Sequence, residues 1–256
     1  MASPTSILIT GASGAIGSAL ARSYATHGVT LVLTGRDTQR LKEIAAECRD
    51  CGATVKTVLT DLTDAEAVRE QFRALDKAHR FSLVIINQGV NASTEPTSRL
   101  EEWSAVERLI DVNLRASFAL CNAVLPGMLG RGCGQLALIS SLAAYVGLPR
   151  TPTYSATKAG LKAYAEALRG GLAGTGVQIN LVMPGYVQSA MEHGMPGPKP
   201  FLWSPEQAAV RIKKGLARNR ARICFPQPFA FGVFLLCLFP PDLAQRILGW
   251  LGYRGD

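Results

Sequence analysis

The sequence is poor in charged residues and in the residues that build metal sites. Asp, Glu, Lys and Arg make up 18% of the 256 residues, below the usual share of about a quarter, so much of the surface is expected to be apolar. Only one CxxC pair, Cys48 and Cys51, occurs among the six cysteines, and no second pair or nearby histidine completes a tetrahedral site. We therefore expect no metal, and scattered thiols in a chain this long fit a reducing compartment.

Acidic residues are missing from one long region. No Asp or Glu lies between Glu206 and Asp242, whereas six Lys and Arg residues lie between Arg211 and Arg222. Nucleic acid can bind such a run, but no recognition motif or aromatic platform accompanies it, so no nucleic-acid partner is expected. The first Arg is Arg22 and no cation precedes the first apolar run, so we predict no signal peptide and a cytoplasmic location.

Ser/Gly linkers, repeats and low-complexity tracts are also missing, which favours a single domain. Short runs of Val, Ile and Leu alternate with helical patterns. The strand-like runs are continuously apolar, as is typical of strands buried on both faces of a parallel sheet. The alternation predicts a Rossmann-type doubly wound parallel sheet flanked by helices. Strands are predicted at 6–10, 30–34, 54–59, 82–87, 134–140 and 177–183, and helices at 15–27, 37–51, 64–78, 99–130, 153–172 and 205–218.

A glycine-rich loop, TGASGAIG, follows the first predicted strand and opens a helix. Gly11 suits the tight turn, and Gly14 and Gly17 leave room for a pyrophosphate and for close packing of the helix. The helix N-terminus offers its N–H groups and positive dipole to the phosphates. A glycine trio in this context predicts a dinucleotide site, the alternative being an ordinary strand-to-helix turn.

The end of the second strand predicts which dinucleotide binds. An acidic residue there binds the ribose 2′-hydroxyl of NAD, but this sequence has Gly35 followed by Arg36, which favours the 2′-phosphate of NADP. Asp37 starts a helix and is interpreted as its N-cap. Ser13 is a second candidate for the 2′-phosphate. We expect NADPH as the cofactor rather than NADH.

Tyr154 and Lys158 carry the chemistry that the sequence suggests. They are four residues apart on a predicted helix, and a neighbouring ammonium favours the phenolate that a tyrosine needs for acid–base work. Taken alone, such a pair is more often one buried ring beside one solvated cation. It is accompanied by Ser140 and Ser141 at the end of a strand and by Asn113 inside an apolar helical stretch, where a buried amide needs hydrogen-bond partners.

With these motifs in order, residues 6 to about 190 resemble the short-chain dehydrogenase/reductase superfamily, in its short single-domain branch. The resemblance implies that Tyr154 exchanges a proton with a carbonyl or alcohol, that Lys158 lowers its pKa and binds the nicotinamide ribose, that Ser141 polarises the substrate oxygen and that Asn113 holds a relay water. It also implies a cofactor-binding set: Gly11, Ser13, Gly14, Ile16, Gly17, Arg36, Asp61, Leu62, Asn87, Gly89, Tyr154, Lys158, Pro184, Gly185, Val187 and Ser189.

Three positions depart from the family pattern. Ala15 replaces a glycine of the fingerprint, the family's NNAG stretch is here Ile86-Asn87-Gln88-Gly89 with one Asn and the Gly retained, and Ser189 replaces a threonine. The glycine spacing resembles the branch that acts on sugar nucleotides, but the chain is too short for that branch's substrate domain. None of the departures removes a reacting group. We expect an oxidoreductase that is a homo-oligomer, with a sugar-nucleotide epimerase or dehydratase, or a non-catalytic NADP sensor or scaffold, as alternatives.

The loops after the fifth and sixth strands indicate a lipophilic ketone or alcohol, because they offer no cationic clamp for an acid. Their candidate wall residues are Leu142, Tyr145, Val146, Leu148, Met191, Met195, Phe201 and Trp203.

The C-terminal segment is the remaining clue. We divide the chain into a dinucleotide-binding and catalytic part, 1–222, and an apolar extension of the same domain, 223–256. The run at 229–239 has eleven residues, too few to span a bilayer, and a short amphipathic helix is predicted after it. Beside the basic cluster it suits contact with an anionic membrane surface. The alternatives are a subunit interface and a flap over the substrate pocket.

Overall fold

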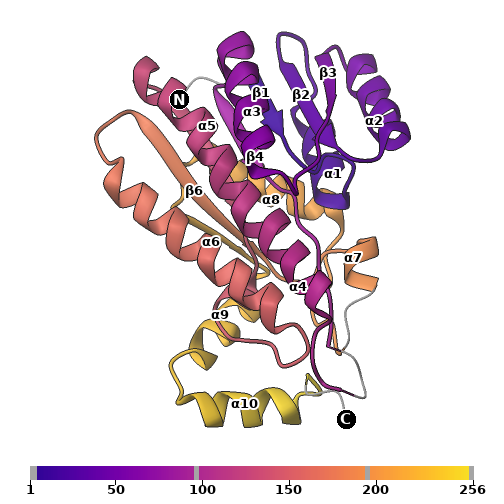
Figure 1. The fold of residues 1–256 in the computed structure, drawn as a ribbon, viewed down its shortest axis with the longest axis vertical. Helices are drawn as coiled ribbons and strands as arrows, with labels where there is room; N and C mark the ends of the chain where they lie inside the picture. The colour runs from indigo at the N-terminus through magenta and orange to yellow at the C-terminus, as the bar shows by residue number, and fades with distance from the viewer. Residues whose placement is uncertain (1–4, 95–97, 194–196, 254–256) are drawn as a thin grey trace.

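Seven parallel strands form one sheet in the computed structural model, which describes residues 5–94, 98–193 and 197–253 (Figure 1). Their order is β3-β2-β1-β4-β5-β6-β7. Successive strands are added toward one edge of the sheet up to β3 and toward the other edge from β4 onward, so the strand order reverses between β1 and β4. The predicted doubly wound architecture is confirmed. The strands are β1 (Ser6–Ile9), β2 (Thr30–Gly35), β3 (Thr54–Leu59), β4 (Leu83–Ile86), β5 (Gly134–Ile139), β6 (Val177–Pro184) and β7 (Arg222–Phe225).

Helices cover both faces of the sheet, which explains the continuously apolar strands. In β1, Ile7 and Ile9 join the core under one set of helices while Leu8 joins the core under the other. Successive side chains of a strand point to opposite faces, so a strand buried on both sides needs an apolar residue at every position. One face is covered by α1 (Ala15–Tyr24), α2 (Thr38–Asp50) and α8 (Pro205–Ala217), and the other by α3 (Ala65–His79), α5 (Ala116–Arg131) and α6 (Pro152–Gly171).

The long helical zone predicted for 99–130 is one continuous helix with a changed winding in its middle. It consists of α4 (Trp103–Leu109), a π-helical segment η1 (Ile110–Arg115) and α5. By length and composition alone, Trp103–Arg131 could cross a membrane, but 56% of its apolar window is buried inside the protein. Its contacts with α3 and α6 are those of a core helix, and core helices pass the same test.

Three elements in the C-terminal part of the chain were not predicted: the strand β7 and the helices α7 (Ala190–His193) and α9 (Gln227–Leu236). β7 follows the basic cluster and pairs in parallel with β6, and the short helix α7 precedes α8. The apolar run forms α9. The predicted amphipathic helix is present as α10 (Pro241–Trp250), and a 3-10 turn, η2 (Leu142–Ala144), follows β5. Asp37 caps α2 as predicted, because its carboxylate accepts a hydrogen bond of 3.0 Å from the Arg40 N–H.

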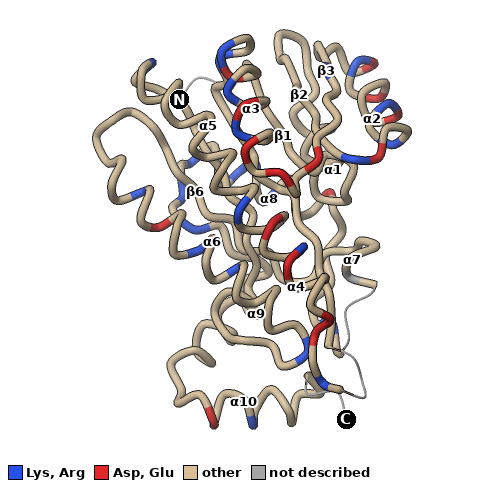
Figure 2. Tube along the Cα trace, in the orientation of Figure 1, with Lys and Arg blue, Asp and Glu red and all other residues tan. Residues whose placement is uncertain are grey.

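The basic cluster and the apolar extension lie apart. Helix α9 contains no charged residue and α10 contains Asp242 and Arg246, whereas the cations of α8 lie higher in the molecule (Figure 2). Lys213 donates to the Ser23 carbonyl and lies over the Tyr24 ring, with Nζ 4.8 Å from the ring centroid. Arg222 pairs with Glu166 at 2.7 Å. These contacts hold Lys213 against α1 and Arg222 against α6, while Lys214, Arg218 and Arg220 are exposed.

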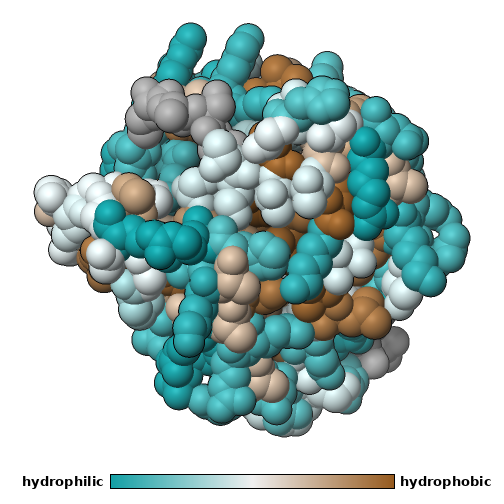
Figure 3. Space-filling view, turned by 90° about the horizontal axis from the view of Figure 1, so that it is seen from above, coloured by the Kyte–Doolittle hydropathy of each residue, from teal (hydrophilic) through white to brown (hydrophobic). Residues whose placement is uncertain are grey.

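The two ends of the molecule differ in their surfaces. The end farthest from α10 is mainly hydrophilic, with smaller apolar areas between polar side chains (Figure 3). At the α9–α10 end, by contrast, large apolar side chains are exposed, with Trp250 at 86%, Leu238 at 67% and Phe231 at 62%. The apolar surface expected from the composition is therefore concentrated in part at the C-terminal helices.

Candidate active site

A cavity of about 950 Å³ runs along the carboxyl ends of the strands. It begins at the glycine loop between β1 and α1, passes the end of β5 and the start of α6, and ends against α9 and α10. In a doubly wound sheet the ligand crevice lies outside these strand ends, at the point where the strand order reverses. The cavity has that position, beside β1 and β4.

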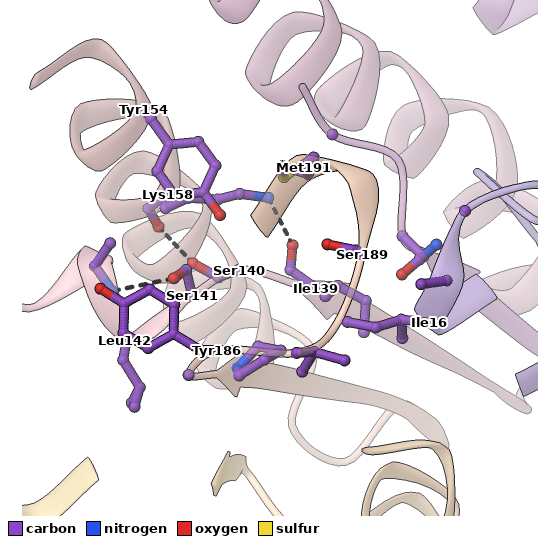
Figure 4. Close-up of a pocket in the computed structure, with 18 of the residues that line it drawn as sticks. Ile16, Ile139, Ser140, Ser141, Leu142, Tyr154, Lys158, Tyr186, Ser189 and Met191 are labelled. Atoms are coloured by element: carbon purple, nitrogen blue, oxygen red, sulfur yellow. Dashed lines mark hydrogen bonds between the residues drawn. The ribbon is translucent and has the colours of Figure 1, made fainter. Parts of the chain in front are cut away.

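Tyr154 and Lys158 meet in the middle of this cavity, as shown in Figure 4. Both side chains are buried, and the Lys158 Nζ lies 5.6 Å from the centroid of the Tyr154 ring. The same Nζ donates to the Ile139 carbonyl at the end of β5, at 3.1 Å. Ser140 Oγ donates to the Lys158 carbonyl at 2.7 Å, so the neighbouring strand fixes the backbone of α6 at the lysine.

Ser141 is placed to act on the same point. Its Oγ accepts the N–H of Ala143 at 3.1 Å, and the side chain also hydrogen-bonds Tyr154. Ser140 also lines the cavity, but its hydroxyl proton is donated to the Lys158 carbonyl of α6. Of the two serines, Ser141 is therefore the one whose hydroxyl lies beside the Tyr154 hydroxyl and is available to hydrogen-bond a substrate oxygen.

Burial dominates the acid–base properties of the pair. It raises the pKa of Tyr154 above the ordinary value of a phenol, while the hydrogen bond from Ser141 acts in the opposite, smaller sense. Burial lowers the pKa of Lys158 to about 8. At neutral pH the tyrosine is thus a protonated donor beside a lysine that still carries its charge. An ammonium at this distance favours the phenolate once the proton leaves.

Asn113 builds the wall beside the lysine. It lies in η1, is fully buried, and does not line the cavity directly. Its Oδ1 accepts the Val90 N–H at 2.8 Å and its Nδ2 donates to the Val90 carbonyl at 2.9 Å and to Thr157 Oγ1 at 3.3 Å. Both ends of the amide are used, which satisfies a polar group inside an apolar helix. The side chain ties the loop after β4 to α6.

The glycine loop is packed too tightly for side chains. Gly11 has a φ of +60°, and a Cβ added at Gly17 would lie 2.3 Å from the Gly11 carbonyl oxygen. Asn87 Nδ2 donates to the carbonyls of Thr10 and Gly11 at 3.1 Å each and holds the loop against β4. Gly17 therefore packs behind the loop, and the loop's open side faces the cavity.

Two cations stand at the far edge of this end of the cavity. Arg36 and Arg40 are exposed and both line it, together with Asp37. A Cβ at Gly35 would lie 2.8 Å from Ser13 Oγ, so a larger residue at this position would push against the glycine loop. Arg40 was missed by the sequence reasoning. The sequence pattern that could have indicated it is a second cation four residues after Arg36, in the first turn of α2.

Most of the predicted residues lie along the cavity, and three do not. Gly17 and Asn113 pack behind its wall. The Asp61 carboxylate accepts from the Thr63 N–H and Oγ1, at 3.0 and 2.8 Å, and these bonds hold its pKa below the usual range. The predicted residues that line the cavity are Gly11, Ser13, Gly14, Ile16, Arg36, Leu62, Asn87, Gly89, Ser141, Tyr154, Lys158, Pro184, Gly185, Val187 and Ser189.

The opposite end of the cavity is apolar. Of the predicted wall residues, Leu142, Val146, Leu148, Met191 and Phe201 line it, and Met195 lies outside the described residues. Two predictions were wrong: Tyr145 packs edge-on against Phe234, and Trp203 stacks on Phe225 at 5.1 Å. Sequence reasoning missed the wall made by the C-terminal segment and the loop after β6: Tyr186, Pro228, Phe229, Gly232, Val233, Leu236, Ile247, Leu248, Leu251 and Tyr253.

The C-terminal segment therefore covers the cavity, as one of the alternative interpretations held. Leu236 of α9 and Leu248 of α10 form a small core with Val146 and Leu148 of the loop after β5. Gln245 Nε2 donates to the Gly147 carbonyl at 2.9 Å. These contacts fix both helices over the apolar end.

A glycine-lined nucleotide crevice and a buried Tyr/Lys/Ser group define an NAD(P)-dependent oxidoreductase of the Rossmann type. Residues 5–197 match the family model for the short chain dehydrogenases, and the chain belongs to that family. A protein of Myxococcus xanthus (strain DK1622), described as an uncharacterized oxidoreductase, is 38% identical over 237 residues, which are 92% of this chain and 93% of the relative.

Solved structures agree with this assignment. A short-chain dehydrogenase from Sphingobium yanoikuyae in complex with NADPH has a TM-score of 0.81 at 27% identity, covering 98% of each chain. A putative NAD(P)-dependent gluconate 5-dehydrogenase from Beutenbergia cavernae with bound NADP has a TM-score of 0.76 at 26% identity, covering 86% of this chain and 93% of its own.

The buried lysine generates a test of the site's electrostatics. Its folded-state pKa of about 8 lies below the ordinary lysine value of 10.5, so at pH 7 folding must keep a proton on a buried amine. Between about pH 8 and 10.5 the folded protein loses this proton first, and stability rises with pH because the unfolded state then binds more protons. We expect Lys158→Met to be more stable than wild type at pH 7, by at least about 1 kcal/mol.

That advantage should shrink as the pH rises through this window. Urea unfolding of both proteins at pH 7 and pH 10 measures the difference, and groups common to both proteins cancel. A variant that is less stable at pH 7, or an equal difference at both pH values, would show that burial of Lys158 is not costly.

Proposed function

We propose that the protein is an NADP-dependent oxidoreductase that moves a hydride between the nicotinamide and a carbonyl or secondary-alcohol carbon of a lipophilic substrate. One observation carries the proposal. Tyr154, Lys158 and Ser141 converge midway along a cavity whose one end is a glycine loop flanked by cations and whose other end is apolar. A nucleotide cofactor and an apolar substrate would then meet at the tyrosine.

The residues present fit the cofactor. The loop from Gly11 to Gly17 is too tightly packed for side chains on its inner side, and its open side, where a pyrophosphate would lie, faces the cavity at the positive dipole end of α1. Arg36 and Arg40 would hold the 2′-phosphate, and the NADP(H) bound to the two related structures favours the same choice. Asn87, Gly89 and Lys158 would contact the riboses, and the segment from Pro184 to Ser189 the nicotinamide end. When bound, NADPH supplies the hydride.

The chain's own residues would manage the proton. In the reducing direction Tyr154 Oη donates its proton to the substrate oxygen as that oxygen becomes negative, and Ser141 Oγ donates a hydrogen bond to the same oxygen. The phenolate left on Tyr154 is stabilised by the Lys158 ammonium. Asn113 acts as a positioning residue, because it ties Val90 to Thr157 beside the lysine. The apolar walls exclude water from the step.

A non-catalytic NADP sensor or scaffold is the alternative from another class. Such a protein would not need a charged lysine buried beside the tyrosine, because burial of the charge lowers the stability of the fold. Here the lysine is buried, and Ser141 hydrogen-bonds the tyrosine. A sugar-nucleotide epimerase or dehydratase would need polar groups for a second nucleotide. The apolar end of the cavity favours a ketone or alcohol instead.

Replacing the proton donor tests the proposed function most simply. Tyr154→Phe keeps the ring and removes the hydroxyl, so NADPH binding should stay nearly unchanged while turnover falls by at least ~10², the lower end of what general acid catalysis contributes. A panel of ketones and alcohols, including long-chain keto lipids, is followed by NADPH absorbance for both proteins. Near-normal turnover in the variant would refute the role of Tyr154.

Cofactor choice is tested at the edge of the nucleotide end. A charge-assisted contact with the 2′-phosphate contributes about 1.5–3 kcal/mol, so Arg36→Ala should weaken NADPH binding roughly 10–100-fold and hardly affect NADH. Fluorescence titration of each reduced cofactor measures both constants, and Arg40→Ala compares the second cation. Equal weakening of NADPH and NADH would mean that Arg36 does not select the cofactor.

Contact with a membrane stays a prediction for the C-terminal helices, and its physical basis changes. The cations of α8 lie away from α9 and α10 (Figure 2), whereas the side chains of Phe231, Leu238 and Trp250 on the C-terminal helices and their connection are exposed. We therefore expect any binding to vesicles to resist salt. Leu238→Glu should reduce cosedimentation with phosphatidylcholine vesicles several-fold, while Leu129→Glu on α5 should not. Equal binding by both variants, or none by wild type, would exclude the membrane contact.

A further inference from the structure

One face of α9 forms the roof of the apolar end of the cavity. The residues on it that line the cavity recur at helical spacing, and all but one carry a bulky side chain: Pro228, Phe229, Gly232, Val233 and Leu236. Residues three and four apart lie side by side on a helix, so Gly232 lies between the Phe229–Pro228 end and Leu236. The single residue without a side chain thus occupies the middle of the roof.

Gly232 leaves real space at this position. Gly232 is exposed at the open side of the cavity that it lines, and a Cβ added there would meet no atom within 4 Å, so no neighbouring side chain occupies this space. Close packing does not require the glycine, in contrast to Gly185, where a Cβ would lie 3.0 Å from the Phe229 ring. Glycine is also the poorest helix former after proline, so local helix stability does not favour it either.

The C-terminal segment offers mainly apolar side chains to the cavity around Gly232, and Tyr253 is its one described lining residue with a polar side-chain atom. Leu248 and Leu251 of α10 and Leu148 of the loop after β5 line this end. Among the described residues that line the cavity, the Lys, Arg, Asp and His side chains are Arg36, Asp37 and Arg40 at the nucleotide end, Lys158 at the centre and His193 of α7. A substrate group reaching Gly232 would therefore be uncharged.

We propose that Gly232 sets the upper size limit of the substrate, leaving room for a bulky apolar substituent on the carbonyl, such as a long alkyl chain. The inference rests on the proposed function, because it assigns the apolar end of the cavity to the substrate. It adds a specificity-determining residue in the C-terminal extension. A side chain at position 232 would point into the space that the long substituent uses and leave the reacting group at Tyr154 in place.

The test compares Gly232→Leu and Gly232→Phe with wild type on methyl ketones of rising length, from butan-2-one to dodecan-2-one, with NADPH. Wild type should prefer the long ketones, and the ratio of kcat/KM for dodecan-2-one to that for butan-2-one should fall at least about 10-fold in both variants. Gly232→Ala should change the ratio less and raise the melting temperature, since alanine favours the helix.

Gly130→Phe is the matched control. Gly130 is also a helical glycine, on α5, where an added Cβ meets nothing within 4 Å, but it does not line the cavity. Its substrate ratio should equal that of wild type. Calorimetric titration of each protein with dodecan-2-one and butan-2-one, in the presence of NADP, gives a readout that does not depend on turnover.

The outcomes separate this inference from the proposed function. If wild type reduces no ketone, the proposed reaction fails, and the binding ratio still decides the role of Gly232. A selective loss of dodecan-2-one binding in the Leu and Phe variants supports that role. An unchanged ratio in both folded variants, or wild-type binding that does not increase with chain length, would overturn it.

Discussion

The burial of one ammonium group is the constraint on which the active site depends. Lys158 carries a positive charge in a place where burial brings its pKa down to about 8, and such a group persists only where its surroundings hold it. The surroundings are specific: the Ile139 carbonyl accepts from Nζ, and Ser140 fixes the backbone of the lysine to the end of β5. The proposed acid, Tyr154, owes its environment to the same arrangement, because it precedes Lys158 by one helical turn.

The two ends of the cavity are built by different parts of the chain. The nucleotide end follows from the doubly wound sheet, which places a glycine loop and a helix N-terminus where the strand order reverses. The apolar end is built by α9 and α10, which pack on the loop after β5 through Leu236 and Leu248. Substitutions in the C-terminal helices can therefore change which substrate fits while the strand ends keep Tyr154 and Lys158 in place.

The sequence predicted the sheet, and it predicted that Tyr154 and Lys158 lie on one helical face, because both depend on local patterns. Continuous apolar runs reveal strands buried on two faces, and the spacing of Tyr154 and Lys158 places them on one face of a helix. β7 was missed because four residues, RICF, acquire their strand form only by pairing with β6. Arg40 was not predicted because it lies within the following helix, α2, and not directly after Gly35 at the strand end as Arg36 does.

The substrate wall was harder to predict, because it depends on where a segment docks. Tyr145 and Trp203 were expected to line the cavity, but their loops turn the rings toward Phe234 and Phe225. Helix α9 is apolar on almost all sides, so its sequence pattern does not indicate which face meets the cavity. From the sequence alone, Gly232 is only a residue of low helix propensity, and its place at the cavity follows from how α9 docks.

Hydride transfer is the claim that joins these parts, and isotope transfer tests it most directly. Two samples of NADPH, each with deuterium on one of the two faces of the nicotinamide C4, are used to reduce a lipophilic ketone, and the alcohol is analysed by mass spectrometry. We predict that one sample gives an alcohol with deuterium on the carbinol carbon and the other gives none. Ketone reduction without deuterium in the product from either sample would contradict a direct transfer from nicotinamide to substrate.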